Sequence, residues 1–186
     1  MITARRGDGT GYIALDEFKF EHSSGDAEYC TIRPDDATPT VTTTAPPTPH
    51  PHLPSCDFEQ DACNWEIMGL AFKWEIVNDT VLDDNSLLGP VNSAGNFLYA
   101  NPKDGVAGEV TYLTSPTFEA PEKGACLRFR FAMEHHGGIK HFQVKMGDTV
   151  IWNLTDHSAE SIGMWEEGQV LVQGDQVKKI SIYYDF

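Results

Sequence analysis

Residues 126–133 read CLRFRFAM, and this stretch decides the fold class. Leu127, Phe129 and Phe131 occupy every second position, with arginines between them. A two-residue period of this kind indicates a β-strand with one buried face and one solvated face.

Segments of similar character recur along the chain at short intervals. They are rich in β-branched and aromatic residues, and they are separated by Gly, Pro and Asn, while no long 3.6-residue period competes with them. The further segments are residues 72–77, 96–100, 110–114, 142–146, 150–154, 169–172 and 177–184. The sequence therefore predicts an all-β fold, an antiparallel β-sandwich.

Charge excludes one large class of partner. The chain has 186 residues, with 28 acidic and 13 basic side chains and a formal net charge of -15. A phosphate backbone or an anionic membrane surface would repel such a chain, so no nucleic-acid partner is expected. No run of about 18 apolar residues occurs, so any membrane attachment is expected only through parts of a longer protein.

The cysteines and glycosylation signals indicate an oxidising compartment. Four cysteines are present without CxxC spacing, which favours disulfides over a zinc site. Asn78-Asp79-Thr80 and Asn153-Leu154-Thr155 are acceptors for N-glycosylation. Residues 1–7 lack the features of a signal peptide. We therefore expect a fragment of a larger exported protein whose signal lies upstream, in the extracellular space or at the cell surface.

Residues 34–54 differ in composition from the rest of the chain. They read PDDATPTVTTTAPPTPHPHLP and contain seven of the eleven prolines and six threonines. This composition predicts a linker that resembles an O-glycosylated stalk. It is either a spacer that holds two domains apart or an unselected disordered connector.

Residues 56–66 read CDFEQDACNWE and resemble the opening of a MAM domain, the extracellular module of meprins, receptor tyrosine phosphatases and neuropilins. Further similar strings follow in the family's order, and together they extend the resemblance to residues 56–186. These strings are NFLYA (96–100), YLTSPTF (112–118), CLRFRFAM (126–133), FQVKM (142–146), VIW (150–152) and MWEEGQVLV (164–172).

A second match precedes the linker. Residues 4–20 read ARRGDGTGYIALDEFKF and, with Cys30, are similar to the closing hairpin and last cysteine of another MAM domain. We therefore predict three parts: residues 1–33 as the end of a preceding MAM domain, residues 34–54 as the linker, and residues 55–186 as a MAM domain lacking its C-terminal strands. The resemblance implies a jelly-roll-like sandwich with disulfides.

The two incomplete pieces add up to nearly one module. A sandwich that lacks its last strands exposes a sheet edge and an apolar face. We therefore hypothesise that the N-terminal tail completes the sheet through Ile13, Leu15, Phe18 and Phe20, as in a permuted domain. On this hypothesis Cys30 pairs with Cys126. The family resemblance implies the other pair, Cys56 with Cys63.

No catalytic constellation is evident, and no enzymatic activity is predicted. The sequence contains no GxSxG elbow, phosphate-binding loop or plausible Cys/His nucleophile pair. The cluster of Glu134 with three nearby histidines is interpreted as a solvated loop, because no HExxH motif is present.

A structural calcium ion is the one cofactor considered. MAM-like modules place carboxylates where the first and last strands meet, and the matching residues here are Asp57, Glu59, Asp16 and Glu17. Carboxylate oxygens are suitable calcium ligands. Hydrogen bonding at strand ends is the alternative role, and Lys73 stands where the family usually has a carboxylate.

The resemblance implies a role in cell adhesion or protein–protein interaction, with an extracellular or homophilic partner. Two alternatives remain open: a glycan-binding β-sandwich, in which Trp152 or Trp165 would stack on sugar, and an accessory domain of an ectoenzyme such as a meprin-like protease or a receptor phosphatase. The four tryptophans are otherwise expected to pack in the core or at its rim.

Overall fold

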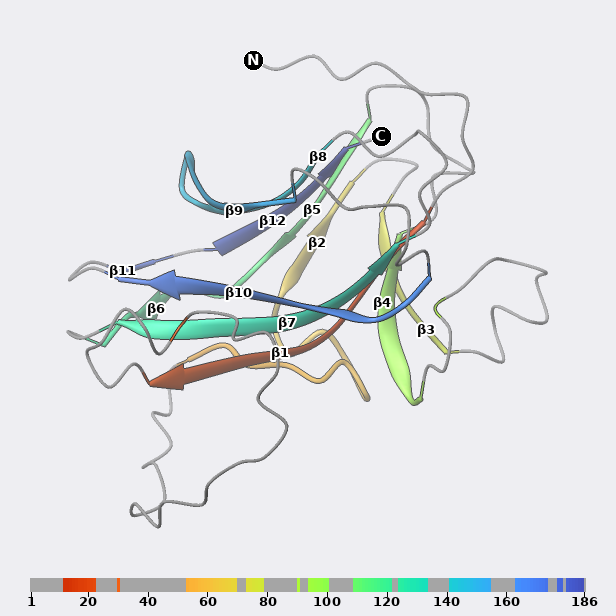
Figure 1. Ribbon diagram of the computed structural model, residues 1–186, viewed down its shortest axis with the longest axis horizontal. Helices are drawn as coiled ribbons and strands as arrows, with labels where there is room; N and C mark the ends of the chain where they lie inside the picture. Colours follow the sequence, from red (N-terminus) through yellow and green to blue (C-terminus); the bar gives the residue numbers. More distant parts are fainter. Residues whose placement is uncertain are drawn as a thin grey trace, which may run out of the picture.

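A computed structural model of the chain forms an antiparallel β-sandwich (Figure 1). The residues that it describes are 12–22, 30, 53–69, 73–78, 90, 94–100, 109–121, 124–133, 141–154, 163–173, 177–178 and 180–185. They contain twelve strands and no α-helix: β1 (Ile13–His22), β2 (Glu66–Met68), β3 (Trp74–Asn78), β4 (Asn96–Ala100), β5 (Val110–Thr114), β6 (Phe118–Glu119), β7 (Ala125–Met133), β8 (His141–Met146), β9 (Thr149–Asn153), β10 (Glu166–Val172), β11 (Val177–Lys178) and β12 (Ile180–Asp185).

The strands form two five-stranded sheets and one small pair. The first sheet has the order β10, β7, β1, β4, β3, and the second has the order β2, β5, β12, β8, β9, while β11 pairs with β6. Every strand pairing is antiparallel. The predicted all-β sandwich is confirmed. All eight strand-like segments overlap observed strands, whereas the short β2 and β6 were not predicted.

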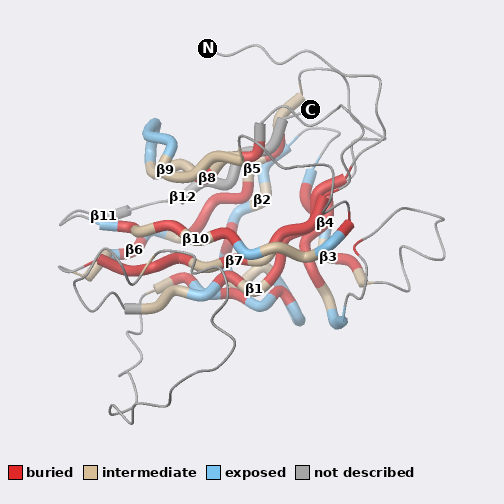
Figure 2. Tube along the Cα trace, in the orientation of Figure 1, coloured by how far each residue is buried: buried red, intermediate tan, exposed pale blue. Residues whose placement is uncertain are grey.

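The main core lies between the two sheets (Figure 2). Its large, fully buried side chains come from both sheets and include Trp74, Leu98, Phe129, Phe131 and Phe142. The predicted alternation in 126–133 holds, because β7 buries its apolar positions while its two arginines stay partly exposed. Burial of each such aromatic or aliphatic side chain stabilises the fold by about 1.5–3 kcal/mol.

The N-terminal strand β1 lies in the middle of the first sheet, between β4 and β7 (Figure 1). Ile13 pairs with Ala100 on one side and with Met133 on the other. Ile13, Leu15 and Phe18 are fully buried, and Phe20 packs against the same core. The prediction that the tail completes the sheet is confirmed.

A β-bulge in β1 explains why its inward residues are not evenly spaced. Between Asp16 and Lys19 the register with β7 shifts, and Glu17 has a φ of 52°. The extra residue lets Leu15 and Phe18 both face the core although they are three positions apart. It also turns the Phe18 backbone to Cys56, with which it exchanges N–H···O bonds of 2.7 and 2.8 Å.

Two disulfides join parts of the sandwich. Cys30 is bonded to Cys126 on β7, and Cys56 is bonded to Cys63. The first links the N-terminal segment covalently to the strand beside β1. The second closes a short loop at the point where β1 contacts the residues that begin the MAM-like region.

Several sequence interpretations lie outside the described residues, namely the Arg-Gly string before residue 12, the linker up to residue 52 and the histidine-rich loop from Glu134. Within the described part of the chain, no helix is long and apolar enough to cross a membrane.

Candidate functional site

The β1 bulge forms one wall of an open cavity of about 410 Å³, which we call the bulge cavity. It is lined by Asp16, Glu17, Lys19, Asp57, Glu59, Ala94, Arg130 and Trp165. These residues come from β1, β7, the loop closed by the short disulfide and the segments that precede β4 and β10.

All four carboxylates singled out in the sequence line this cavity. Asp16 and Glu17 stand at the bulge of β1, and Asp57 and Glu59 follow Cys56. The pairing of Phe18 with Cys56 brings the two pairs together across about 40 residues of chain. The family's carboxylate positions therefore share one site.

Glu59 is fixed by its neighbours. Its Oε2 accepts a hydrogen bond from the Asn96 backbone N–H (3.1 Å), and its carbonyl oxygen accepts one from Asn96 Nδ2 (2.7 Å). Gly95 has a φ of +76°, and a Cβ there would overlap the Glu59 carboxylate. The positive φ therefore favours glycine at this position, and an added Cβ would displace the end of the Glu59 side chain.

Glu17 is engaged by two cationic side chains. Lys19 Nζ lies 2.8 Å from Glu17 Oε2, and Arg130 Nη1 lies 3.8 Å from Oε1. The Arg130 guanidinium lies over the Trp165 ring at 5.1 Å from its centroid, an arrangement that favours a cation–π interaction. Trp165 in turn makes an edge-on contact with Phe97. The cavity thus contains its own cations.

Asp16 has a perturbed acidity. The residue is only 6% exposed, and its Oδ1 accepts a hydrogen bond from the Glu17 N–H (2.8 Å). The pKa of Asp16 is raised from 3.8 to about 6, mainly by burial and also by the charges of Glu17 and Glu59, whereas the backbone hydrogen bond and Arg130 oppose the shift. The ionised carboxylate is therefore less favourable here than in water.

The cavity offers hard oxygen ligands, and its two cations, Lys19 and Arg130, both pair with one of its carboxylates, Glu17. In the described part of the chain, no three His, Cys, Asp or Glu side chains converge with metal-binding geometry. A calcium ion would compete with Lys19 and Arg130 for Glu17. Calcium binding by these four residues therefore stays a proposal, tested in the Discussion.

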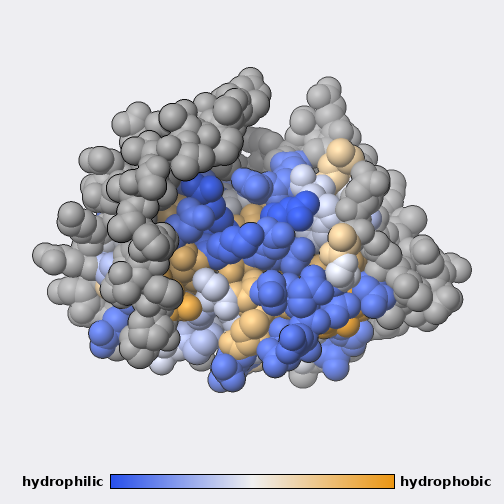
Figure 3. Space-filling model, turned by 90° about the horizontal axis from the view of Figure 1, so that it is seen from below, coloured by the Kyte–Doolittle hydropathy of each residue, from blue (hydrophilic) through white to orange (hydrophobic). Residues whose placement is uncertain are grey.

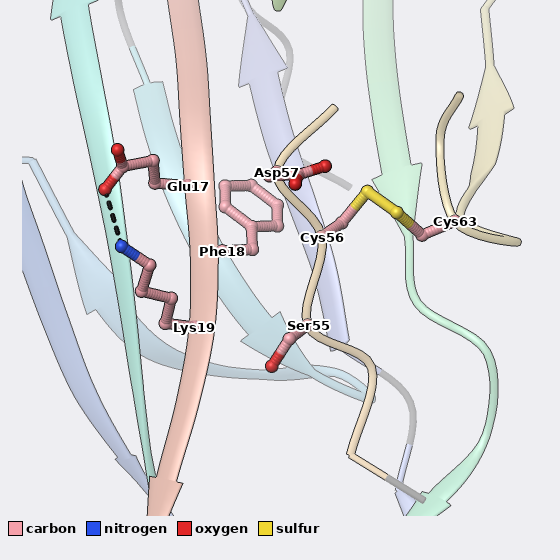
Figure 4. Close-up of a pocket in the computed structure, with 7 residues that line it drawn as sticks. All are labelled: Glu17, Phe18, Lys19, Ser55, Cys56, Asp57 and Cys63. Atoms are coloured by element: carbon pink, nitrogen blue, oxygen red, sulfur yellow. Dashed lines mark hydrogen bonds and ion pairs between the residues drawn. A yellow bond between two sulfur atoms is a disulfide. The ribbon is translucent and has the colours of Figure 1, made fainter. Parts of the chain in front are cut away.

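A second, smaller hollow lies beside the short disulfide (Figure 4). In this view Phe18 points toward the Cys56 segment, while Glu17 and Lys19 turn away from it. Phe18 makes edge-on contacts with Phe58 and Trp65, each with ring centroids 5.0 Å apart. Trp65 Nε1 donates to the carbonyl of Pro54 (3.0 Å). These aromatic contacts join β1 to residues 54–65.

A charged strip continues from the bulge cavity along β1, β7 and β10. It surrounds a shallow cavity of about 150 Å³ lined by Glu17, Lys19, Glu21, Arg128, Phe129, Arg130 and Glu167. Arg128 Nε lies 3.2 Å from Glu21 Oε2, within ion-pair distance but without hydrogen-bond geometry. The sequence pattern did not predict this strip as a site. Its signal is the pair of alternating arginines in 126–133, which by itself indicates only a solvated face.

The tryptophans pack against other side chains. Trp65 and Trp74 are buried. Trp152 makes contacts with Phe129, Phe131 and Phe142 at centroid distances of 5.1, 5.6 and 5.4 Å. Both Trp152 and Trp165 therefore have neighbours that occupy part of their ring surface.

Comparison with known protein families decides the family. The model of the MAM domain, meprin/A5/mu, matches residues 56–183, well over half of the chain. The chain belongs to the MAM domain family. MAM domains are extracellular adhesion and protein-interaction modules in general, and they are generally non-catalytic accessory modules. No solved structure matches the chain.

The matched region excludes β1, yet β1 lies at the centre of the first sheet of the MAM sandwich. The two disulfides agree with the extracellular setting in which MAM domains occur.

Proposed function

We propose that this chain acts as a non-catalytic extracellular MAM module in cell adhesion or protein–protein interaction at the cell surface. The observation that carries the proposal is the MAM match over 56–183. In a longer secreted or membrane-anchored parent, residues 1–33 would be the end of a preceding MAM repeat and residues 34–54 the spacer, whereas in this chain β1 completes the sheet of the following MAM region.

The charged strip is the surface that we propose for partner contact. It presents Lys19, Arg128 and Arg130 among Glu17 and Glu21 on the outer side of the first sheet. Figure 3 shows that hydrophilic residues cover much of one face, with smaller apolar areas between them. Alternating charges of this kind select a partner with the complementary pattern and steer its approach. A second copy of the chain is the first partner to test.

Bead aggregation with the full chain tests both adhesion and the strip. Beads coated with the chain should aggregate, or should bind cells that display a partner, and Lys19→Glu with Arg128→Glu should weaken this binding about tenfold or more. Lys73→Glu is the matched control, because Lys73 is similarly exposed but pairs with Glu75 on β3. Absence of both self-binding and cell binding contradicts the adhesion proposal. An equal loss of binding in the Lys73→Glu control would contradict a role of the charged strip in partner contact.

The alternatives have less support. Glycan binding through Trp152 or Trp165 would need ring surface that Phe142, Phe97 and Arg130 partly occupy. Glycan-array binding that is lost on replacing either tryptophan would favour it nevertheless. A protease or phosphatase domain in the same reading frame would identify an ectoenzyme accessory domain.

A further inference from the structure

The described strands leave four sheet edges, and each edge presents backbone groups to which another strand could pair. Among the described strands, the first sheet ends in β10 and β3, and the second ends in β2 and β9. Open edges promote aggregation unless they are short, charged or covered.

Two of these edges have a simple form of protection. β2 contains only Glu66–Met68, which is too short to template a long pairing. β10 begins with the adjacent carboxylates Glu166 and Glu167, the second of which is exposed. Short length and charge are the usual means of blunting a sheet edge.

The other two edges have less of this protection. β9 reads TVIWN, has no charged residue and exposes 43% of Val150. β3 reads WEIVN and carries a single charge, the exposed Glu75. Short uncharged segments rich in β-branched and aromatic residues are prone to cross-strand association when they stand at an edge.

Both of these strands end at a glycosylation acceptor. Asn78 is the last residue of β3, and Asn153 is the last residue of β9. Each begins an Asn-x-Thr signal, completed by Thr80 and Thr155. One signal therefore falls on each sheet, in both cases on the edge strand that is neither very short nor highly charged.

Neither asparagine is deeply buried, since both are of intermediate exposure. The Oδ1 atom of Asn153 is itself buried and has no hydrogen-bond partner among the described residues, so that oxygen gives no structural reason for an asparagine there. A bulky, hydrophilic oligosaccharide at the end of a strand obstructs the approach of a second strand along the same edge.

We propose that N-glycans on Asn78 and Asn153 shield the β3 and β9 edges against pairing with a second copy of the chain. The modification joins the side-chain Nδ2 to the first sugar of a lipid-pyrophosphate oligosaccharide, with loss of one amide proton and release of the lipid pyrophosphate. The proposal rests on the extracellular location in the proposed function, because this transfer takes place in the secretory pathway. It leaves the charged strip on β1 and β7 open for adhesion.

Glycopeptide mass spectrometry of the full chain secreted from animal cells tests occupancy. We expect oligosaccharide on both asparagines. The paired variant Thr80→Ala with Thr155→Ala removes both signals, while Thr80→Ser with Thr155→Ser keeps them and is the matched control. Unmodified Asn78 or Asn153 in the secreted wild type overturns the proposal for that edge.

Light scattering after size exclusion tests shielding. The variant with both threonines replaced by alanine should contain several-fold less monomer and more of larger species than the wild type. It should also show new hydrogen-exchange protection in residues 74–78 and 149–153, whereas the variant with both threonines replaced by serine should behave as the wild type. Trimming the glycans of the folded wild type to a single sugar should cause the same loss of monomer and the same new protection, and it requires no refolding of the protein. Trimmed protein that stays monomeric, without new protection in either strand, overturns the shielding role. A glycosylated monomer that binds no partner contradicts the proposed function alone.

Discussion

Phe18→Ala removes the side chain by which the N-terminal strand enters the MAM core. Phe18 is fully buried and makes edge-on contacts with Phe58, Trp65 and Phe129 at centroid distances of 5.0, 5.0 and 6.0 Å. Its backbone pairs with Cys56, so it joins β1 to the first residues of the family match. No other residue of β1 combines these contacts.

The expected loss of stability is large. Truncating a buried phenylalanine to alanine costs about 3–5 kcal/mol, from lost burial and the cavity that remains. For a chain of this size, each kcal/mol lowers the melting temperature by about 2–4 °C. The variant should therefore melt about 6–20 °C below the wild type.

The assay is thermal and urea unfolding of the full chain without reductant, with Lys19→Ala as the control. Lys19 is the next residue, and its side chain is 59% exposed, so its removal should change stability by less than about 0.5 kcal/mol. A loss below about 1 kcal/mol for Phe18→Ala would show that Phe18 does not anchor β1 in the core.

Three further predictions concern the bulge cavity. Asp16→Asn should stabilise the fold by roughly 1 kcal/mol at about pH 7.5 and should have no effect below about pH 4. The reason is that the pKa of Asp16 is raised to about 6 in the native state, so the stability of the wild type falls as the pH rises through that value. The full pKa shift would correspond to about 3 kcal/mol, and we expect less because the cavity opens to solvent. Urea titrations at both pH values measure this effect, and an equal gain at both would exclude ionisation as its cause. On the calcium proposal, calcium in place of chelator should raise the melting temperature, because an ion that binds only the native state stabilises it, although it must compete with Lys19 and Arg130 for Glu17; an unchanged melting temperature would contradict calcium binding in the cavity. Gly95→Ala should cost about 1–3 kcal/mol by calorimetry, because its φ of +76° is unfavourable for alanine and the added Cβ would displace Glu59; wild-type stability would argue against this loop geometry.

A local pattern predicted the sandwich, whereas the position of β1 was predicted from the family resemblance of two incomplete pieces and from the sheet edge that the second piece would expose. Alternation along 126–133 and the apolar positions Ile13, Leu15, Phe18 and Phe20 are visible without coordinates. Leu15 and Phe18 are three positions apart instead of two, and the bulge between Asp16 and Lys19 accounts for this spacing.

The side-chain partners in the bulge cavity could not be predicted in the same way. Arg130 meets Trp165 and Glu17 only because β7 lies between β1 and β10, and no local pattern specifies that order. The carboxylates of the cavity were found through the family resemblance, whereas the cations that match them were missed. The three-residue β2 was missed because a segment so short carries no periodicity.

The N-terminal segment closes the same sandwich that the MAM region forms. Non-reducing peptide mapping of the folded monomer tests this closure, because Cys30 and Cys126 are separated by 96 residues and come together when β1 occupies the centre of the sheet. We expect one peptide pair joining Cys30 to Cys126 within a single chain, beside the pair joining Cys56 to Cys63. Finding Cys126 as a free thiol, or only in bridges between chains, would contradict it.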